Sequence, residues 1–374
     1  MLRRSNDKLE RPLVTVWIPA SVRLHYPIKL LIGLVLLEQS SKLDLDFQFG
    51  VAPWAGKPSP NDEAVGTVYW TVQQGADSVR VAFDLQDQGW LFNRSALRTC
   101  DLYFKRGFEP LALSTLPAAW GSRIKPLGLV YPCQRLGVSA RLLPRWLVQR
   151  GPQSLTSLGQ LVQLKQELKL LLQLPLVTDF QRSPTQPAIE GVIFQTRLWE
   201  QGESSDEDLV EVNSMRCALV QGLRAALGPR FRGGLVPTRL ALERHAELVA
   251  TDHYRRRDYV RMSGSYLVGV YSRGLNHSNA FKLGEYLAAA QCIVAEPLRQ
   301  ELPQPLVEKL NYLPFGGVDE CVEGCVQLLE DKRLAAAMRQ ANFEYYCAQV
   351  EPEAHASRLL GEALSFDPSG RLPT

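Results

Sequence analysis

The segment with the clearest chemical potential is residues 266–297, where an apolar run leads into a polar loop and then a helix-forming stretch. The loop supplies a cation, a flexible glycine and small polar side chains, namely Arg273, Gly274, Asn276 and Ser278. Amides at the start of a helix carry a partial positive charge and hold phosphate groups. Lys282 adds a cation in the first turn of that helix. The segment therefore predicts a phosphate-binding loop.

Two further residues are candidates for the same ligand. Glu285 follows Lys282 by three positions, about one helical turn, where a carboxylate can accept hydrogen bonds from both hydroxyls of a ribose. Arg197 comes just after the apolar run 191–195 and would contact phosphate from the end of a strand. The alternative for each is an ordinary surface position on a helix or loop.

Candidates for acid–base chemistry lie in the first half of the chain. Asp84 and Asp87 follow a predicted strand at 79–83, and His25 follows the first predicted strand, two residues after Arg23. Such groups can take the proton of a hydroxyl that attacks a second molecule. An aspartate in a loop is also a common cap of helices and turns, so both interpretations stay open. A further strand end could reach a second substrate through Asp101, Lys105 and Arg106.

The elements that position these residues alternate between strand and helix. Strands are predicted at residues 13–19, 43–49, 67–72, 79–83, 191–195, 232–236, 266–271, 292–295 and 311–315. Helices are predicted at residues 28–39, 158–174, 209–227, 281–290, 319–330, 333–347 and 353–366. This order predicts an α/β protein with two doubly wound, mostly parallel sheets.

The proline-containing segment 182–188 divides the elements into two similar halves. We expect an N-terminal domain over residues 1–182 and a C-terminal domain over 189–350. Residues 351–374 would form a helix and tail that cross back to the first domain. Because ligands bind outside the carboxyl ends of such strands, the cleft between the two sheets is the expected active site.

Length and composition limit the class of protein. The chain has 374 residues, of which 45% are hydrophobic and 22% charged, as in folded two-domain proteins. Seven scattered cysteines indicate reduced thiols of a cytoplasmic protein. The longest apolar run, residues 28–37, is about half the length that spans a bilayer. The N-terminus has no secretory signal pattern. No residues have the spacing of metal ligands, so we expect no metal.

The net charge of +3 hides an uneven distribution. Residues 94–150 contain ten Lys and Arg against two acidic residues, an excess of eight positive charges. This stretch could be a solvated surface, a platform for an anionic acceptor such as a lipid-linked phosphate, or a peripheral contact with the inner face of a membrane. No nucleic-acid-binding module accompanies it, so nucleic acid is not an expected partner.

The second half resembles a known family. The pattern KLGEYLAA at 282–289, the strand CIVAEP at 292–297 and the helical stretches that follow Asp319 resemble the C-terminal half of glycosyltransferases with the GT-B fold. The similarity covers residues 191–360. It implies two Rossmann-like domains that face each other across a cleft. It further implies metal-independent transfer of a sugar from a nucleotide-diphosphate sugar to a saccharide or lipid-linked acceptor, as in cell-surface polysaccharide biosynthesis, with Glu285 on the ribose.

The chain also departs from the family pattern. Retaining members carry a second Glu eight positions before the first, where this chain has His277, a candidate to bind or polarise the transferring sugar. Arg197 matches a phosphate-binding Arg, whereas the Lys expected in 198–202 is missing. The chain thus resembles the "glycosyltransferase family 1-like" or CgeB-like group, and inversion or retention stays open. A sugar-nucleotide epimerase, or an inactive nucleotide-sugar-binding partner of a polysaccharide assembly complex, are the alternatives.

Overall fold

The first half of the chain folds around a six-stranded sheet. The computed structural model describes residues 11–56, 66–154, 158–250, 252 and 256–367. The sheet has the order β2-β1-β3-β4-β5-β6. Its strands are β1 (Leu13–Ile18), β2 (Asp44–Phe49), β3 (Thr67–Gln74), β4 (Asp77–Asp84), β5 (Leu102–Lys105) and β6 (Ile124–Pro126).

One strand of this sheet runs against the others. β3 is antiparallel to both of its neighbours, β1 and β4, while the remaining pairs are parallel. The sheet is mostly parallel, as predicted, and β3 is the exception. Only two residues, Gly75 and Ala76, connect β3 to β4, and parallel neighbours need a crossover of a dozen residues or more. Gly75 has a φ of 60°, which suits such a tight turn.

The second half folds around a five-stranded, fully parallel sheet, as predicted. The strands are β7 (Ile189–Thr196), β8 (Phe231–Leu235), β9 (Tyr266–Tyr271), β10 (Cys292–Ala295) and β11 (Leu313–Pro314). Their order is β11-β10-β9-β7-β8. The direction of winding reverses between β7 and β9, and the carboxyl ends of the two strands at such a switch point border the usual ligand crevice.

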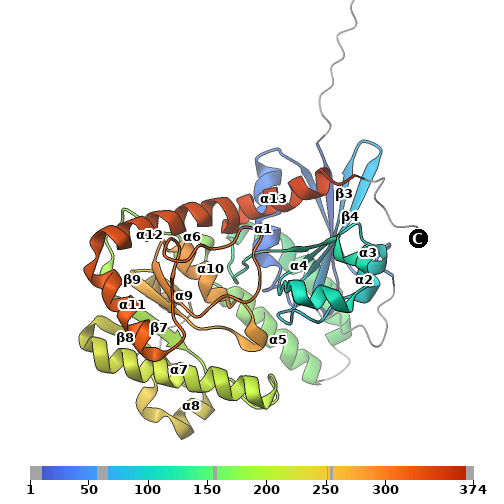
Figure 1. Cartoon of the computed structure of the whole chain (residues 1–374). Coiled ribbons are helices and arrows are strands. Elements are labelled where there is room, and N and C mark those ends of the chain that lie inside the picture. The colour runs from blue at the N-terminus through green and yellow to red at the C-terminus, as the bar shows by residue number, and fades with distance from the viewer. Residues whose placement is uncertain (1–10, 57–65, 155–157, 251, 253–255, 368–374) are drawn as a thin grey trace, which may run out of the picture.

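Helices cover both sheets (Figure 1). The first half contains α1 (Ile28–Gln39), α2 (Arg94–Thr99), α3 (Ala118–Gly121), α4 (Leu136–Ser154) and α5 (Leu158–Gln173). Just before the linker, α6 (Val177–Phe180) packs on α9 and α10 of the other unit. The second half contains α7 (Asp206–Leu227), α8 (Arg239–Arg244), α9 (Arg256–Ser263), α10 (Phe281–Ala288), α11 (Val318–Glu330) and α12 (Lys332–Tyr345). In the described ranges we find no helix long and apolar enough to cross a bilayer. All seven cysteines are free thiols.

The last helix joins the two units. After α12 and one π-helical turn, α13 (Pro352–Leu364) leaves the C-terminal sheet and packs against α1 (Figure 1). Lys29 of α1 is completely buried, where it donates to the Leu129 carbonyl at 2.7 Å and lies 2.7 Å from Nδ1 of His355 on α13. One hydrophobic core continues from the N-terminal sheet to α10 and α13. The two units are thus held at a fixed junction, whereas the exact limits of the domains stay a prediction.

Candidate functional site

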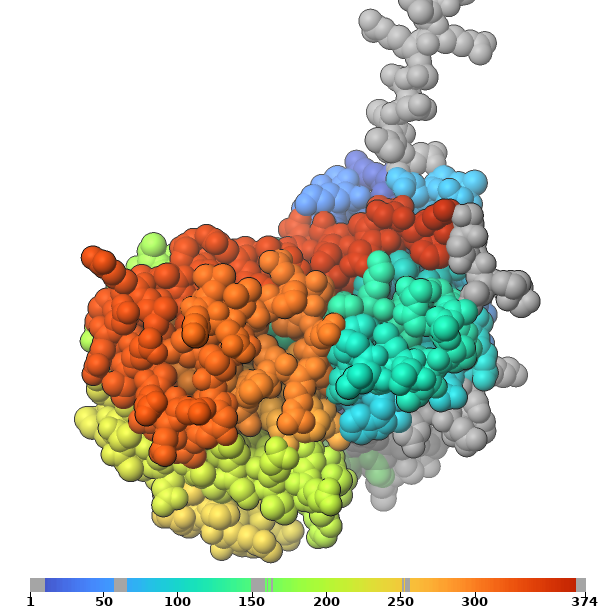
Figure 2. Space-filling model, viewed as in Figure 1, coloured from blue at the N-terminus to red at the C-terminus, as the bar shows by residue number. Residues whose placement is uncertain are grey.

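A cavity of about 830 Å³ lies between the two units. From the first unit it is lined by the loops that follow β1 and β4 and by Arg106 after β5. From the second unit it is lined by residues after β7, by the loop after β9 and by the start of α10. The chain after β10 closes one side, because Gln300 donates to the Asp87 carbonyl at 2.7 Å. In Figure 2 this orange segment lies directly against the teal surface of the first unit.

Most of the predicted ligand-binding residues meet in this cavity. Its lining includes Arg197, Gly274, Asn276, Ser278, Lys282 and Glu285, together with Asp87 from the opposite unit. They come together because the carboxyl ends of neighbouring parallel strands meet at one edge of a sheet. Arg273, His277, His25 and Asp84 are outside that lining.

Glu285 is buried and paired with a cation that the sequence did not indicate. Only 7% of Glu285 is exposed, and it accepts a hydrogen bond from Arg256 at the start of α9. Burial raises the pKa of Glu285, but attraction from Arg256 and Lys282 outweighs burial and leaves the pKa below its ordinary value. Glu285 is therefore an anion at neutral pH. Lys282 itself donates to the hydroxyl of Tyr259 at 2.5 Å.

Arg197 lies at the rim and is held from two sides. Its guanidinium donates to Glu203 at 2.8 Å and stacks 3.6 Å from the ring centre of Trp199. Its side chain is 47% exposed, so a ligand in the cavity can reach it. Stacking on an indole restricts the guanidinium while it keeps its charge, which suits recognition of a phosphate.

A second residue that sequence reasoning missed is Arg216 of α7. It is 4% exposed and joins the ends of β7 and β9 by donating to the Arg197 carbonyl at 2.7 Å, the Arg273 carbonyl at 2.9 Å and the Ser272 hydroxyl at 3.2 Å. Burial lowers the pKa of Arg216 to about 10, so it stays charged at pH 7. No local pattern marks it, because its partners are 19 to 57 residues away.

Arg273 supports the loop from behind. It is buried, and its guanidinium lies 2.6 Å from Asp208 and 3.0 Å from Glu211 of α7. The amide of Asn276 also donates to Asp208, at 2.8 Å. Both contacts fix the loop on the first turns of α7, which Ser205 caps through the Asp208 amide. We interpret Arg273 as a support of the phosphate loop.

The two candidate histidines, His25 and His277, are neutral at pH 7 and lie beside the cavity. Burial, together with the nearby Arg273 and Arg299, lowers the pKa of His277, whose Nε2 is 3.1 Å from Arg299. Burial and the charges of Arg23 and Arg106 lower the pKa of His25 to about 4. Each could serve as a neutral hydrogen-bonding group, but neither lines the cavity.

The two aspartates have opposite environments. Asp84 is 1% exposed and accepts hydrogen bonds from the Tyr103 hydroxyl at 2.5 Å and from Lys105, itself fully buried, at 3.1 Å. Its position is that of a structural ion pair. Asp87 has a side chain that is 46% exposed, faces the cavity and pairs with Arg106. Of the two, Asp87 is the one that a bound molecule can reach.

The basic stretch 94–150 does not form one surface. Lys105 is paired with Asp84 inside the sheet, and Arg106 lies in the cavity wall. Arg123 is buried and donates to the carbonyls at the end of α2. Arg141 pairs with Glu38. The exposed cations of this stretch are therefore separated by cations that the fold uses internally.

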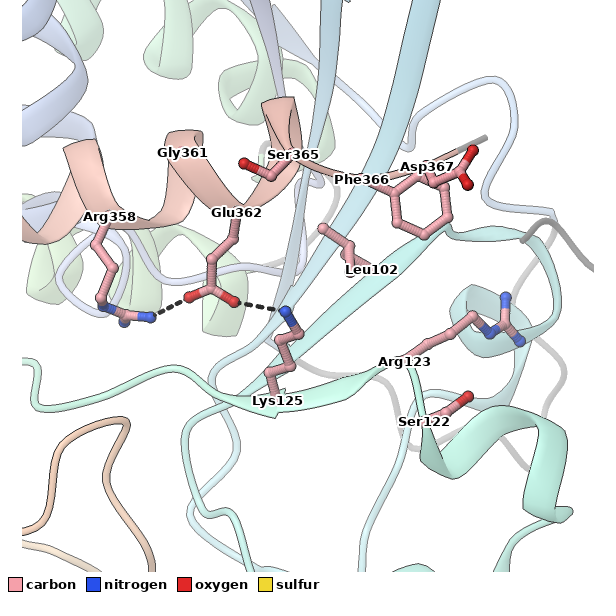
Figure 3. Close-up of a pocket in the computed structure, with 10 residues that line it drawn as sticks. All are labelled: Leu102, Ser122, Arg123, Lys125, Arg358, Gly361, Glu362, Ser365, Phe366 and Asp367. Carbon is pink, nitrogen blue, oxygen red and sulfur yellow. Dashed lines mark hydrogen bonds and ion pairs between the residues drawn. The ribbon is translucent and has the colours of Figure 1, made fainter. Parts of the chain in front are cut away.

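Two other pockets lie in the described part of the chain. One of about 380 Å³ adjoins the cavity, shares Arg197, Trp199, Arg256 and Lys282 with it, and adds apolar walls such as Phe194 and Val236. The other, of about 520 Å³, lies apart between α13 and β6 (Figure 3). There Lys125 and Arg358 both bind Glu362, at 2.9 and 2.6 Å, so its charges are already used. In the described ranges no cluster of three or more His, Cys, Asp or Glu side chains could hold a metal ion.

Comparison with known proteins finds only distant similarities to solved structures. No family model matches the chain, and no curated protein matches it. Among solved structures it is similar to Anabaena HepE in complex with UDP and glucose, with 11% identity over 73% of this chain and 65% of that one, at a TM-score of 0.37. It is also similar to the UDP-GlcNAc 2-epimerase of Neisseria meningitidis bound to UDP-GlcNAc, with 12% identity over 73% and 63% and a TM-score of 0.37.

A third match covers about half of this chain. The C-terminal domain of the glycosyl transferase group 1 family protein LpcC from Francisella tularensis shares 12% identity over 47% of this chain and 97% of that domain, with a TM-score of 0.33. The first two matches span slightly less than two thirds of the known chains. Likenesses of this strength carry no argument about function. The two facing α/β sheets themselves confirm the predicted fold class, apart from β3.

Proposed function

We propose that the protein is a glycosyltransferase that moves a sugar from a nucleotide-diphosphate sugar to a hydroxyl of a saccharide or lipid-linked acceptor without a metal ion. The observation that carries the proposal is the charge of the cavity at the switch point. Five cations line it, Arg23, Arg106, Arg197, Arg256 and Lys282. Three carboxylates oppose them, Asp87, Glu203 and Glu285, which leaves a net charge of +2. A bridging diphosphate diester carries two negative charges and would balance it.

The donor would lie along the C-terminal side. Its diphosphate would contact Arg197, Lys282 and the amides at the start of α10, since residues 280–282 line the cavity. Glu285 would accept hydrogen bonds from the ribose, and Arg256 would turn from Glu285 toward the phosphates as the nucleotide enters. The adjoining apolar pocket, which has Tyr259 and Trp199 in its wall, suits a planar base.

The acceptor would enter from the N-terminal side. We propose Asp87 as the general base, because it is the one among the four predicted catalytic residues that lines the cavity. The acceptor oxygen would bond to the anomeric carbon of the donor, and the hydroxyl proton would move to Asp87. The bond from that carbon to the diphosphate oxygen would break with its electron pair, and the cations would stabilise the leaving diphosphate. This arrangement corresponds to inversion.

Binding is the first test. Titration with UDP, GDP, ADP and CMP, followed by calorimetry and by tryptophan fluorescence, should show one preferred nucleotide. Arg197→Ala and Glu285→Gln should each weaken it by about 10- to 150-fold, because each removes a hydrogen bond to a charged group worth roughly 1.5–3 kcal/mol. Arg94→Ala, an exposed position outside the cavity, is the matched control and should bind normally. If the chain binds none of the four nucleotides, the proposal is wrong.

Turnover is the second test. With the preferred nucleotide sugar and an acceptor, Asp87→Asn should lower kcat by about 10²- to 10⁴-fold and leave nucleotide affinity unchanged. EDTA should not affect the rate. Tight binding without any transfer or hydrolysis would favour the alternative of a binding-only partner, and exchange of a sugar epimer without an acceptor would favour an epimerase.

A further inference from the structure

Helices α4 and α5 pack against each other and form a hairpin on the N-terminal unit (Figure 1). Val138, Leu142 and Trp146 recur every four residues and fix α4 to the core, and Leu171 does the same for α5. The inner face of each helix is therefore packed against the hydrophobic core. The outer face is unusual, because it is neither uniformly polar nor covered by another element of the described chain.

The outer face of α5 combines apolar and basic side chains. Leu161, Lys165, Lys169 and Leu172 are spaced by four, four and three residues, which places them on one side of the helix. Leu161 is 37% exposed and Leu172 61%, while the two lysines are exposed. Val162, next to this row, is 55% exposed. A helix that serves only as solvated surface has little reason to expose three large aliphatic side chains beside its cations.

The charge of this face has one sign. Neither Lys165 nor Lys169 forms a salt bridge with a described carboxylate, and the acid between them, Glu167, is turned inward with a side chain that is 8% exposed. Helix α4 also exposes a cation and an aliphatic side chain, Arg145 and Val148, the latter at 76%. Aliphatic side chains and unpaired cations on one face are the combination that partitions into the headgroup region of an anionic bilayer.

The hairpin also lies next to the cavity. Glu167 of α5 is 3.8 Å from Nε of Arg23, and Arg23 lines the cavity from the N-terminal side. A bilayer on the outer face of α5 would therefore lie at the acceptor side of the cleft. A lipid-linked acceptor could enter from there without leaving the membrane surface.

We propose that the outer face of the α4–α5 hairpin docks on an anionic lipid bilayer. The surface consists of Leu161, Val162, Lys165, Lys169 and Leu172. The lysines attract the headgroups, and the aliphatic side chains insert below them. This surface is distinct from the basic stretch 94–150, since Lys165 and Lys169 lie outside that stretch. Only the reason for docking, delivery of the acceptor, rests on the proposed function.

The full chain would be floated with vesicles of phosphatidylcholine alone or with 30% phosphatidylglycerol. We expect binding to the anionic vesicles only, weakened by salt. Lys165→Gln/Lys169→Gln should weaken it about 30-fold, because each basic residue near such a surface contributes roughly fivefold. Leu161→Ser/Leu172→Ser should weaken it at least tenfold even at low salt. The matched controls, Arg94→Gln/Arg98→Gln on α2 and Leu242→Ser on α8, change similarly exposed residues elsewhere and should bind like the parent chain.

The proposal is overturned if the parent chain ignores anionic vesicles, or if the α2 variant loses binding as strongly as the α5 variants. A chain that is dimeric without lipid and becomes monomeric on Leu161→Ser/Leu172→Ser would instead assign this face to a second copy. Nucleotide binding in solution is measured separately on the same variants. Its absence in the parent chain would refute the proposed function and leave the vesicle result standing.

Discussion

The buried lysine at the junction of the two units predicts a specific dependence of stability on pH. Lys29 is entirely enclosed by α1, α13 and the chain before α4, and its ammonium group contacts the Leu129 carbonyl and His355. Burial, together with the charge of Arg358 and against the opposing effects of Cys133 and Glu351, lowers the pKa of Lys29 from 10.5 to about 7. The folded chain therefore loses this proton near neutrality.

The sign and size of the effect follow from linkage. Between pH 7 and 10.5 the unfolded chain holds a proton on Lys29 that the folded chain lacks, so the free energy of unfolding rises with pH. The full slope is about 1.4 kcal/mol per pH unit. From pH 7 to 8.5 the gain is then about 2 kcal/mol. Histidines and cysteine thiols also titrate near the two ends of this window, and a comparison with a variant that lacks Lys29 cancels their contributions.

Urea denaturation of the parent chain and of Lys29→Met, measured from pH 6.5 to 8.5, tests this reasoning. The difference in unfolding free energy between the two should change by about 2 kcal/mol across the window in favour of the parent chain as pH rises. Lys42→Met removes an exposed lysine, paired with Glu353 of α13, and should keep the slope of the parent chain. Parallel pH profiles for the parent chain and Lys29→Met would refute the assignment of a neutral lysine at this junction.

Three further changes test the packing that holds the site, all by urea denaturation. Gly33→Ala should destabilise the chain by at least about 2 kcal/mol, because its Cβ would lie 2.0 Å from a backbone oxygen of α13, whereas Gly361→Ala has open space and should be neutral or slightly stabilising. Arg216→Met should cost about 3–5 kcal/mol, because three buried acceptors lose their donor, and nucleotide affinity should fall with it. Asp84→Ala should lower the free energy of unfolding by about 3–5 kcal/mol, because it leaves the buried Lys105 unpaired. Asp87→Ala should lower it by less than about 1 kcal/mol, because Asp87 is half exposed. Equal losses for the two variants would contradict their different environments.

The sequence by itself determined which strand ends meet. The alternation of strand and helix predicts parallel sheets, and parallel sheets collect the residues that follow their strands at one edge. This is why Arg197, Lys282 and Glu285, which are 88 positions apart at most, line one cavity. The same argument placed Asp87 opposite them. The hydrophobic periodicity and the alternation of strands and helices depend on residues close together in the sequence, so they can be predicted from it.

The tertiary structure decided which charges are available. Arg256 reaches Glu285 across 29 positions, Lys105 neutralises Asp84 across 21, and Arg216 is enclosed by residues up to 57 positions away. The excess of cations in 94–150 does not form one surface for the same reason, while α5 exposes two lysines that form no salt bridge with a described carboxylate. Whether a charge is buried, paired or exposed depends on which distant side chains pack around it. That information arises only when the two units assemble around α13.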